Sequence, residues 1–357
     1  MSSFKSANPA ENPGISFGSF SAPGVVVPYF DGQVAVAQTI SAFVTVQLLP
    51  GRTEWSDLAY AAAPVGAYLR DIFGGLAQIP VKIVIHDKQV PVGFGRTAAT
   101  LAALAFALDD GESDLATFDP LAPASMCGGA TIVRFQLKED SSDDSSEESG
   151  AAFVADFAQM LSREQLQWVL VSVASSWLRF VDTETDEPEK TEADFLPELL
   201  LEALEAKQPQ QPPRLRQLQQ GLAGGDADAV GSNFVNAMQP EVIKARPIMR
   251  DVQQSLLSET VQFYSRRRDA QQNQIEVAPQ TGSTLAQRPS QSNPYRSLRA
   301  PAYGVVNWTG PGLLYLFSDG NKEDAVDFIT DAATFGNVSQ VRMVHSVRTG
   351  AHVTVAD

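Results

Sequence analysis

The feature that most constrains the fold is a pair of apolar, β-branched segments separated by a short turn. The first segment is VVVPYF at residues 25–30, and the second is QVAVAQTISAFVTVQLL at residues 33–49. Asp31-Gly32 lies between them and is typical of a tight turn, while β-branched residues favour extended backbone. The pattern predicts a long hairpin or meander, which Pro50-Gly51 ends.

Both strands and helices are predicted in the rest of the first 138 residues. Helical spacing of apolar residues, strand-like alternation and glycine or proline breaks mark the elements. The predicted elements are a helix over residues 56–73, two short strands within residues 81–95, a helix from Thr97 to Leu108 and a half-buried strand over residues 130–138. We therefore expect a mixed β/α domain at residues 25–138, preceded by an extended arm at residues 1–24.

The middle of the chain has a different pattern. Residues 139–150, EDSSDDSSEESG, carry no apolar side chain and predict an acidic, Ser-rich loop. A capping box at Ser162 and Gln165 precedes apolar residues spaced at three and four, which predicts helices within a helical domain at residues 151–270. A polar linker at residues 271–298 and a small α/β module at residues 299–357 follow. The expected fold class is α+β, with a β-containing N-terminal part, a helical middle and a small α/β C-terminal module.

Composition excludes several classes of protein. The chain has 357 residues and a formal net charge of −16, so its mean field repels nucleic acid. Cys127 is the single cysteine, which excludes an intrachain disulfide and an all-cysteine zinc site. No apolar run approaches the roughly 18–20 residues of a membrane span. The start of the chain lacks the pattern of a secretory signal. We expect no membrane partner and a reducing, intracellular location.

A positively charged segment stands out against this acidic background. Residues 241–300 hold nine Lys/Arg against five Asp/Glu, a net charge of +4. Arginine beside tyrosine is typical of single-stranded nucleic-acid contacts, where the cation neutralises phosphate and the ring stacks on a base. The same arginines could instead stabilise a helix C-terminus or contact a neighbouring subunit. The candidate contact residues, called the arginine arm below, are Tyr264, Arg266, Arg267, Arg268, Arg288, Tyr295, Arg296 and Arg299.

Catalytic and metal-binding patterns are sparse. The histidines His86, His345 and His352 have no acidic or cysteine partner at ligand spacing, so no metal and no cofactor are predicted. Asp226 and Asp228 are interpreted as a capped loop rather than a calcium loop. The segment from Gly93 to Thr97 precedes a predicted helix, which is the setting for anion binding at a helix N-terminus, but GxG alone is a weak signal. On these patterns the chain is not predicted to be an enzyme.

The leading hypothesis is a self-assembling structural protein. Trp168, residues 199–201 and Phe263 predict apolar helices able to bury surface against copies of the chain. With its N-terminal arm and polar insertions, this organisation is similar in style to the capsid and coat proteins of RNA viruses. That analogy implies a virion or host-cytoplasm location, with copies of itself as partners and RNA or a neighbouring subunit on the arginine arm. The alternatives are a non-enzymatic interaction scaffold and a phosphate-handling enzyme acting at residues 93–97.

Overall fold

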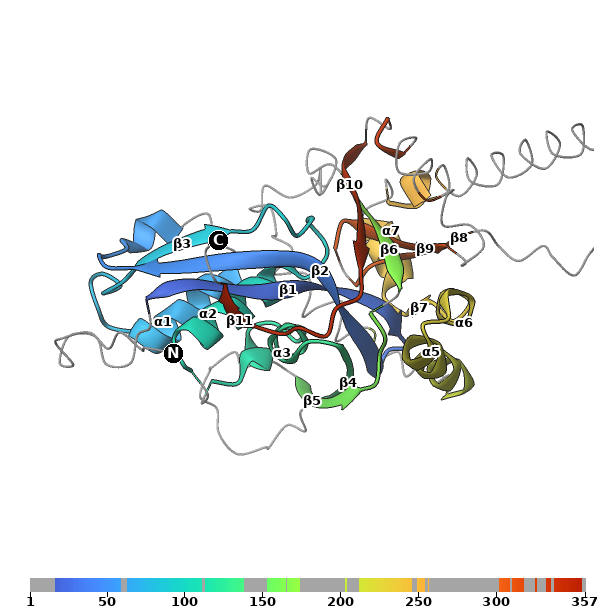
Figure 1. Cartoon of the computed structure of the whole chain (residues 1–357), viewed down its shortest axis with the longest axis horizontal. Helices are drawn as coiled ribbons and strands as arrows, with labels where there is room; N and C mark the ends of the chain where they lie inside the picture. The colour runs from blue at the N-terminus through green and yellow to red at the C-terminus, as the bar shows by residue number, and fades with distance from the viewer. Residues whose placement is uncertain are drawn as a thin grey trace, which may run out of the picture.

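The computed structural model shows a mixed α and β protein with two sheets (Figure 1). Strands dominate the N-terminal part, which confirms the predicted α+β class. The structure describes residues 17–58, 63–110, 113–137, 153–164, 166–173, 203, 212–245, 249–253, 256, 302–308, 310–317, 325, 332–334 and 337–354. The arginine arm and the acidic segment 139–150 lie outside these residues, and the predicted division into domains remains a prediction.

The first sheet is seven-stranded and is built on the predicted hairpin. Its main path runs β11-β1-β2-β4-β5, with β3 paired to β2 and the short β7 paired to β1. All its pairings are antiparallel except that of β1 with β7. The strands are β1 (Gly18–Phe30), β2 (Val34–Leu49), β3 (Lys82–His86), β4 (Ala130–Leu137), β5 (Phe153–Met160), β7 (Val235–Asn236) and β11 (His352–Thr354).

The hairpin prediction is confirmed, and its alternation shows which face is covered. From Ala42 to Leu48 the even residues of β2 are buried and the odd ones are half-buried. Alternation with period two places these two sets on opposite faces. Helices α2 (Arg96–Ala107) and α3 (Ala122–Cys127) pack against β1 and β2, and α1 (Ala63–Phe73) packs on α2. The short 3-10 turns η1 (Trp55–Leu58) and η2 (Leu115–Thr117) complete this layer.

The second sheet is four-stranded, antiparallel and ordered β10-β6-β9-β8. Its strands are β6 (Gln167–Val173), β8 (Ala302–Val306), β9 (Gly312–Phe317) and β10 (Val338–His345). Strands β8, β9 and β10 lie within residues 299–357, where the sequence predicts a small α/β module. Helices α5 (Pro212–Gly224), α6 (Ala227–Gly231) and α7 (Gln239–Ala245) lie at the same end of the molecule (Figure 1). Among the described helices, none is long and apolar enough to cross a membrane.

Two local predictions are wrong. Residues 153–160 and 167–173, predicted as part of a helical region, form the strands β5 and β6. Residues 168–173 are all buried, and a continuous apolar run fits a buried strand as well as a buried helix. The second strand predicted within residues 81–95 is instead a loop, because its glycines adopt left-handed backbone angles that a strand excludes. The loop then leads directly into α2.

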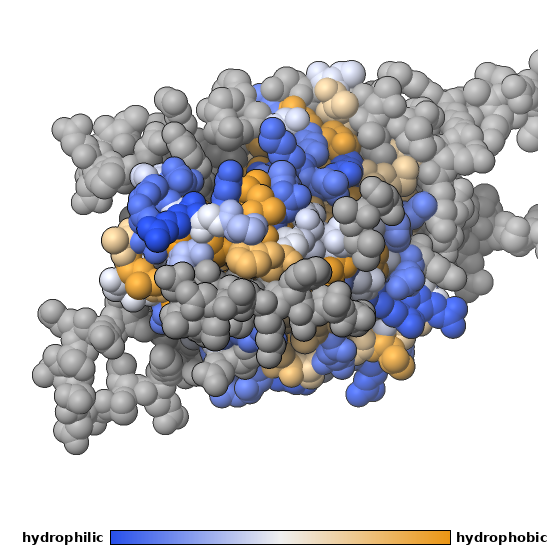
Figure 2. All heavy atoms as spheres, turned by 60° about the vertical axis from the view of Figure 1, so that its left-hand side comes forward, coloured by the Kyte–Doolittle hydropathy of each residue, from blue (hydrophilic) through white to orange (hydrophobic). Residues whose placement is uncertain are grey.

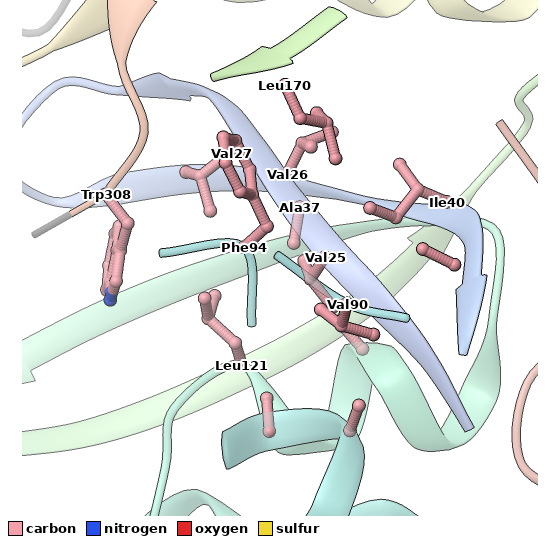
Figure 3. Packing of buried hydrophobic residues seen from close by; sticks show 14 of the residues in the cluster. Val25, Val26, Val27, Ala37, Ile40, Val90, Phe94, Leu121, Leu170 and Trp308 are labelled. Carbon is pink, nitrogen blue, oxygen red and sulfur yellow. The ribbon is translucent and has the colours of Figure 1, made fainter. Parts of the chain in front are cut away.

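One hydrophobic core connects the two sheets. Figure 3 shows Phe94, from the loop before α2, among valines of β1, with Leu170 of β6 and Trp308 of the β8–β9 turn close by. Phe94 is fully buried, so its side chain fixes the loop that carries it to the hydrophobic core. The core therefore brings that loop, β1 and the β8–β9 turn together, although they lie far apart in the sequence.

Candidate functional site

The loop between β3 and α2, residues 87–95, is the best-defined candidate site. Gly93 and Gly95 have φ values of 88° and 71°, in the left-handed region that favours glycine. A Cβ atom at Gly93 would lie 2.6 Å from the backbone nitrogen of Gly312, and one at Gly95 would lie 2.9 Å from that of Val25. Glycine is therefore required at both positions by backbone angle and by close approach. We call residues 93–98 the amide loop.

Arg96 folds back onto the loop that precedes it. Its Nε and Nη2 atoms donate hydrogen bonds of 3.0 and 2.8 Å to the carbonyl oxygen of Val90. Its Nη1 atom lies 3.3 Å from Oδ2 of Asp87 in an ion pair. The planar guanidinium thus holds both ends of a tight turn, which a lysine with one point charge would not do in the same way.

The carbonyl groups of this loop are held from the protein side. Beyond Val90, donors from β10, β6, the β8–β9 turn and β1 reach the carbonyls of residues 89, 92, 93 and 94, and the first α2 bond takes that of Gly95. The pairs are Arg342 Nη1 to Gln89, Ser172 Oγ to Val92 at 2.7 Å, Asn307 Nδ2 to Gly93 at 2.7 Å, the Val25 amide to Phe94 at 3.0 Å and the Ala99 amide to Gly95 at 2.9 Å. The loop is consequently fixed in one backbone conformation.

This arrangement leaves the amide groups on the other side. Within a planar trans peptide unit the carbonyl and the following N–H point in opposite directions, so inward carbonyls give outward N–H groups. In the part of the chain that the structure describes, the amides of Gly93, Gly95, Arg96 and Thr97 have no hydrogen-bond partner, whereas Phe94 and Ala98 are fully buried. Gly93, Gly95, Arg96 and Thr97 are all half-buried rather than covered. The amide loop therefore combines a concave run of backbone donors with a helix N-terminus, two devices that bind anions.

The local charge favours an anion as well. Residues 87–98 hold Lys88 and Arg96 against Asp87, a net charge of +1 in a chain of −16. Arg342 of β10 adds a further cation beside Gln89. No acidic residue occupies the first turn of α2, so the positive end of the helix dipole is not compensated there. The acidic protein has a locally positive site at this loop.

The structure describes only some of the residues that the sequence predicted as candidate sites. The arginine arm, with all of its eight candidate residues, lies outside the described part of the chain, so its role remains a prediction. Asp226 accepts a hydrogen bond from the amide of Ala229 as the N-cap of α6, in agreement with a capped loop. The three histidines lie on β3, β10 and β11. Among the described residues, no group of three or more His, Cys, Asp or Glu could hold a metal ion.

The best-defined site in the structure corresponds to a sequence pattern of low specificity, GxG before a helix. Residues 93–97 were an alternative because GxG alone is common, and the sequence showed only that they precede a helix. Ser172, Asn307 and Arg342, which hold the carbonyls inward, are 80, 214 and 253 residues away from their partners. No local pattern marks them, so sequence reasoning missed all three.

Comparison with known proteins finds similar solved structures but no similar sequence. No family model matches the sequence, and no curated protein matches it at a significant level. The fold matches mevalonate diphosphate decarboxylase from Staphylococcus aureus with a TM-score of 0.53 and 14% identity, covering 95% of this chain and 98% of that one. A protein assigned as homoserine kinase from Listeria monocytogenes matches with a TM-score of 0.50 and 12% identity, covering 95% of this chain and 99% of that one. Mevalonate kinase from L. major matches with a TM-score of 0.50 and 13% identity, covering 94% of this chain and 98% of that one.

These matches overturn the hypothesis of a coat protein. The chain shares its fold with these three enzymes over nearly its full length. The predictions of a viral capsid subunit, of a non-enzymatic role and of a virion location are therefore wrong. The apolar surface inferred for Trp168 is also absent, since this residue is fully buried in β6. On the face of the molecule that Figure 2 shows, hydrophilic side chains separate the hydrophobic patches of the described residues.

Proposed function

We propose that this protein is a small-molecule phosphotransferase that binds the phosphates of a nucleoside triphosphate in the amide loop. The observation that carries the proposal is the set of carbonyls at residues 92–95 that the protein holds, which leaves the amides of Gly93, Gly95, Arg96 and Thr97 without partners among the described residues at the start of α2. The fold supports it, because two of the similar proteins are named as kinases and the third as a decarboxylase of a diphosphate.

The chemistry of phosphoryl transfer matches what this site offers. Such reactions depend on positioning and on stabilising charge that spreads over phosphate oxygens, rather than on covalent chemistry by the protein. The amide loop supplies fixed donors that need no reorganisation when the charge develops. Thr97 contributes a hydroxyl beside the amides, and Arg96 contributes a cation held against Val90. The acceptor is proposed to be a small molecule, as the names of the similar proteins suggest.

A charge placed inside the site provides the decisive test. In Thr97→Glu the new carboxylate competes with phosphate for the amides and the dipole of α2. We expect the variant to lose the ATP-dependent increase in melting temperature and any ATP turnover that the wild type shows. The same carboxylate should raise the stability of the unliganded protein by about 0.3–1 kcal/mol at low salt, because it compensates the helix dipole. Opposite changes in binding and in stability separate loss of the site from loss of the fold.

The matched control is the same substitution at Thr349, an exposed residue between β10 and β11. Thr349→Glu changes the net charge equally and should keep ATP-dependent stabilisation. If the wild type is not stabilised by ATP or by inorganic phosphate, or if Thr97→Glu binds as well as the wild type, the amide loop is not a phosphate site and the proposal fails.

A further inference from the structure

Strand β5 forms one margin of the seven-stranded sheet, and no further strand lies on its outer edge in the part of the chain that the structure describes (Figure 1). It pairs with β4 over all 8 of its residues without a register shift. The outer edge of such a strand presents a row of backbone N–H and C=O groups that can pair with another strand. β5 is therefore a candidate surface for a partner.

Proteins usually protect edges of this kind, and the strands at the other ends of the two sheets carry such protection. β11 has 3 residues and β8 has 5, while β10 contains a register shift and Arg342. Short length, irregular pairing and charged side chains each discourage a strand from pairing with another chain. In contrast, β5 contains no proline and no bulge, and Asp156 is its single charged residue.

The apolar side chains along β5 are incompletely covered. Successive residues lie on opposite faces of the sheet, and on both faces apolar side chains pack against the core but stay half-buried, namely Ala155, Phe157, Ala158 and Met160. Leu161, which directly follows the strand, is 80% exposed. A strand added along this edge would remove apolar surface from water on both faces, which favours association.

The two ends of β5 also differ in charge. Residues 139–150, which contain acidic but no basic side chains, precede the strand in the sequence. At the other end Arg163 and Arg348 are exposed, and Nε of Arg348 donates a 2.9 Å hydrogen bond to the carbonyl oxygen of Ser162. Antiparallel pairing of two copies brings the arginine end of each strand to the end that follows the acidic residues in the other. Such charge complementarity favours a second copy of this chain as the partner.

We propose that β5 is a dimer interface, in which it pairs antiparallel with β5 of a second copy about a two-fold axis. The interface lies outside the amide loop and is independent of the proposed phosphate site. The axis stands perpendicular to the joined sheet, because only then does the sheet continue from one copy into the other. Directly opposed residues share a face, so even residues oppose even ones and odd residues oppose odd ones.

The register follows from charge and length. A centre at Asp156 would oppose two carboxylates, whereas a centre at Phe157 pairs the whole segment 153–161 with itself. That register places Asp156 opposite Ala158 of the partner subunit, and Ala155 opposite Gln159 of the partner subunit. No two like charges are then opposed within the segment.

Opposite charges introduced at Ala158 test this pairing in the full chain. Ala158→Asp places a carboxylate opposite Asp156 of the partner subunit, Ala158→Lys places a cation there, and the symmetry repeats each pair. Analytical ultracentrifugation over a dilution series gives the dissociation constant of the dimer, and thermal unfolding reports on the fold. We expect a dimeric wild type. The dissociation constant of Ala158→Asp should exceed that of Ala158→Lys by about tenfold or more, because opposed like charges destabilise a cross-strand pair and unlike charges stabilise it.

The matched control is Gln136, an exposed residue of β4 that lies one strand inside the edge. Gln136→Asp and Gln136→Lys change the net charge equally, and their dissociation constants should agree within about twofold, because salt screens charges at that separation. A wild type that stays monomeric over the dilution series overturns the proposal. Equal constants for the two Ala158 variants also overturn it, since the dimer would then use another surface.

A cross-link decides the question should the Ala158 variants not fold. In a Cys127→Ser background, the double variant Ala155→Cys with Gln159→Cys sets thiols directly opposite each other across the axis, within reach of a disulfide. Mild oxidation should join two chains in this variant. Each single variant should remain uncross-linked, because its two thiols lie four residues apart along the paired strands. A double variant that cross-links no more than the single variants contradicts the interface.

Discussion

Arg96, the first residue of α2, donates two hydrogen bonds to the carbonyl oxygen of Val90, at 3.0 and 2.8 Å. Val90 lies in the turn that precedes this helix. The guanidinium therefore closes the turn at residues 87–90, while side chains of the second sheet hold the following carbonyls from the protein side. This double attachment is the structural basis of a preformed amide loop, since a loop that had to be ordered on binding would lose affinity to that ordering.

Replacing this fork tests its contribution to stability. We expect Arg96→Lys to lower the free energy of unfolding by about 1–2 kcal/mol, because an ammonium cannot reproduce two bonds to the Val90 oxygen together with the ion pair to Asp87. Urea unfolding measures the change. The matched control is Arg52→Lys, at an exposed arginine with one long hydrogen bond to Gln78, which should change stability by less than about 0.5 kcal/mol. Equal losses in the two variants would mean that the fork is not a special contact.

The two buried tryptophans of the described core allow a paired test. Trp168 donates its indole N–H to Oγ of Ser346 at 2.9 Å, whereas the indole N–H of Trp308 is buried without a hydrogen-bond partner. Both rings are nearly or fully buried, so Trp→Phe removes similar apolar area at each position. Trp168→Phe should cost at least about 1 kcal/mol more than Trp308→Phe, because it strands a buried hydroxyl while Trp308→Phe removes an unsatisfied donor. Chemical denaturation of both variants gives the difference, and a reversed order would contradict it.

Gly312, on the far side of the loop from Arg96, is limited by close packing rather than by backbone angle. A Cβ atom there would lie 2.8 Å from the ring of Phe94 and 3.0 Å from the carbonyl oxygen of Gly93. Gly312→Ala should destabilise the protein by about 1–3 kcal/mol, because the fully packed ring has no room to move. At Gly224, the last residue of α5, a Cβ would meet nothing within 4 Å. Gly224→Ala should therefore stabilise by about 0.4–1 kcal/mol, and thermal unfolding of both variants checks the opposite signs.

Alkaline unfolding should depend on Tyr68. Burial, followed by the hydrogen bond to Asp110, raises the pKa of the Tyr68 hydroxyl well above its ordinary value of 10.0. The folded protein keeps this proton where the unfolded chain loses it. The contribution to stability is therefore complete below pH 10 and falls as the pH rises above it. One such group gives a slope of about 1.4 kcal/mol per pH unit. Tyr68→Phe should flatten the loss of stability above pH 10 by that amount, and an unchanged slope would refute the assignment.

The sequence predicted local structure well where one period dominated. The alternation of residues 33–49 and of residues 130–138, together with the Asp31-Gly32 turn, predicted β2, β4 and the hairpin, because a half-covered sheet imposes a period of two. It misled at residues 167–173, where a strand buried throughout carries no such period. Part of the site was visible too: the glycines 93 and 95 before a helix were identified, although their role was ranked below that of the arginine arm.

What the sequence by itself determined was therefore the kind of backbone in several places: extended in the hairpin and in β4, and helical from Thr97 to Leu108. Only the tertiary structure decided what that backbone does. Ser172, Asn307 and Arg342 reach the loop across 80 to 253 residues of chain, and they hold its carbonyls towards the protein. The physical reason is that hydrogen-bond direction depends on partners brought together by packing, which leaves no spacing in the sequence to read.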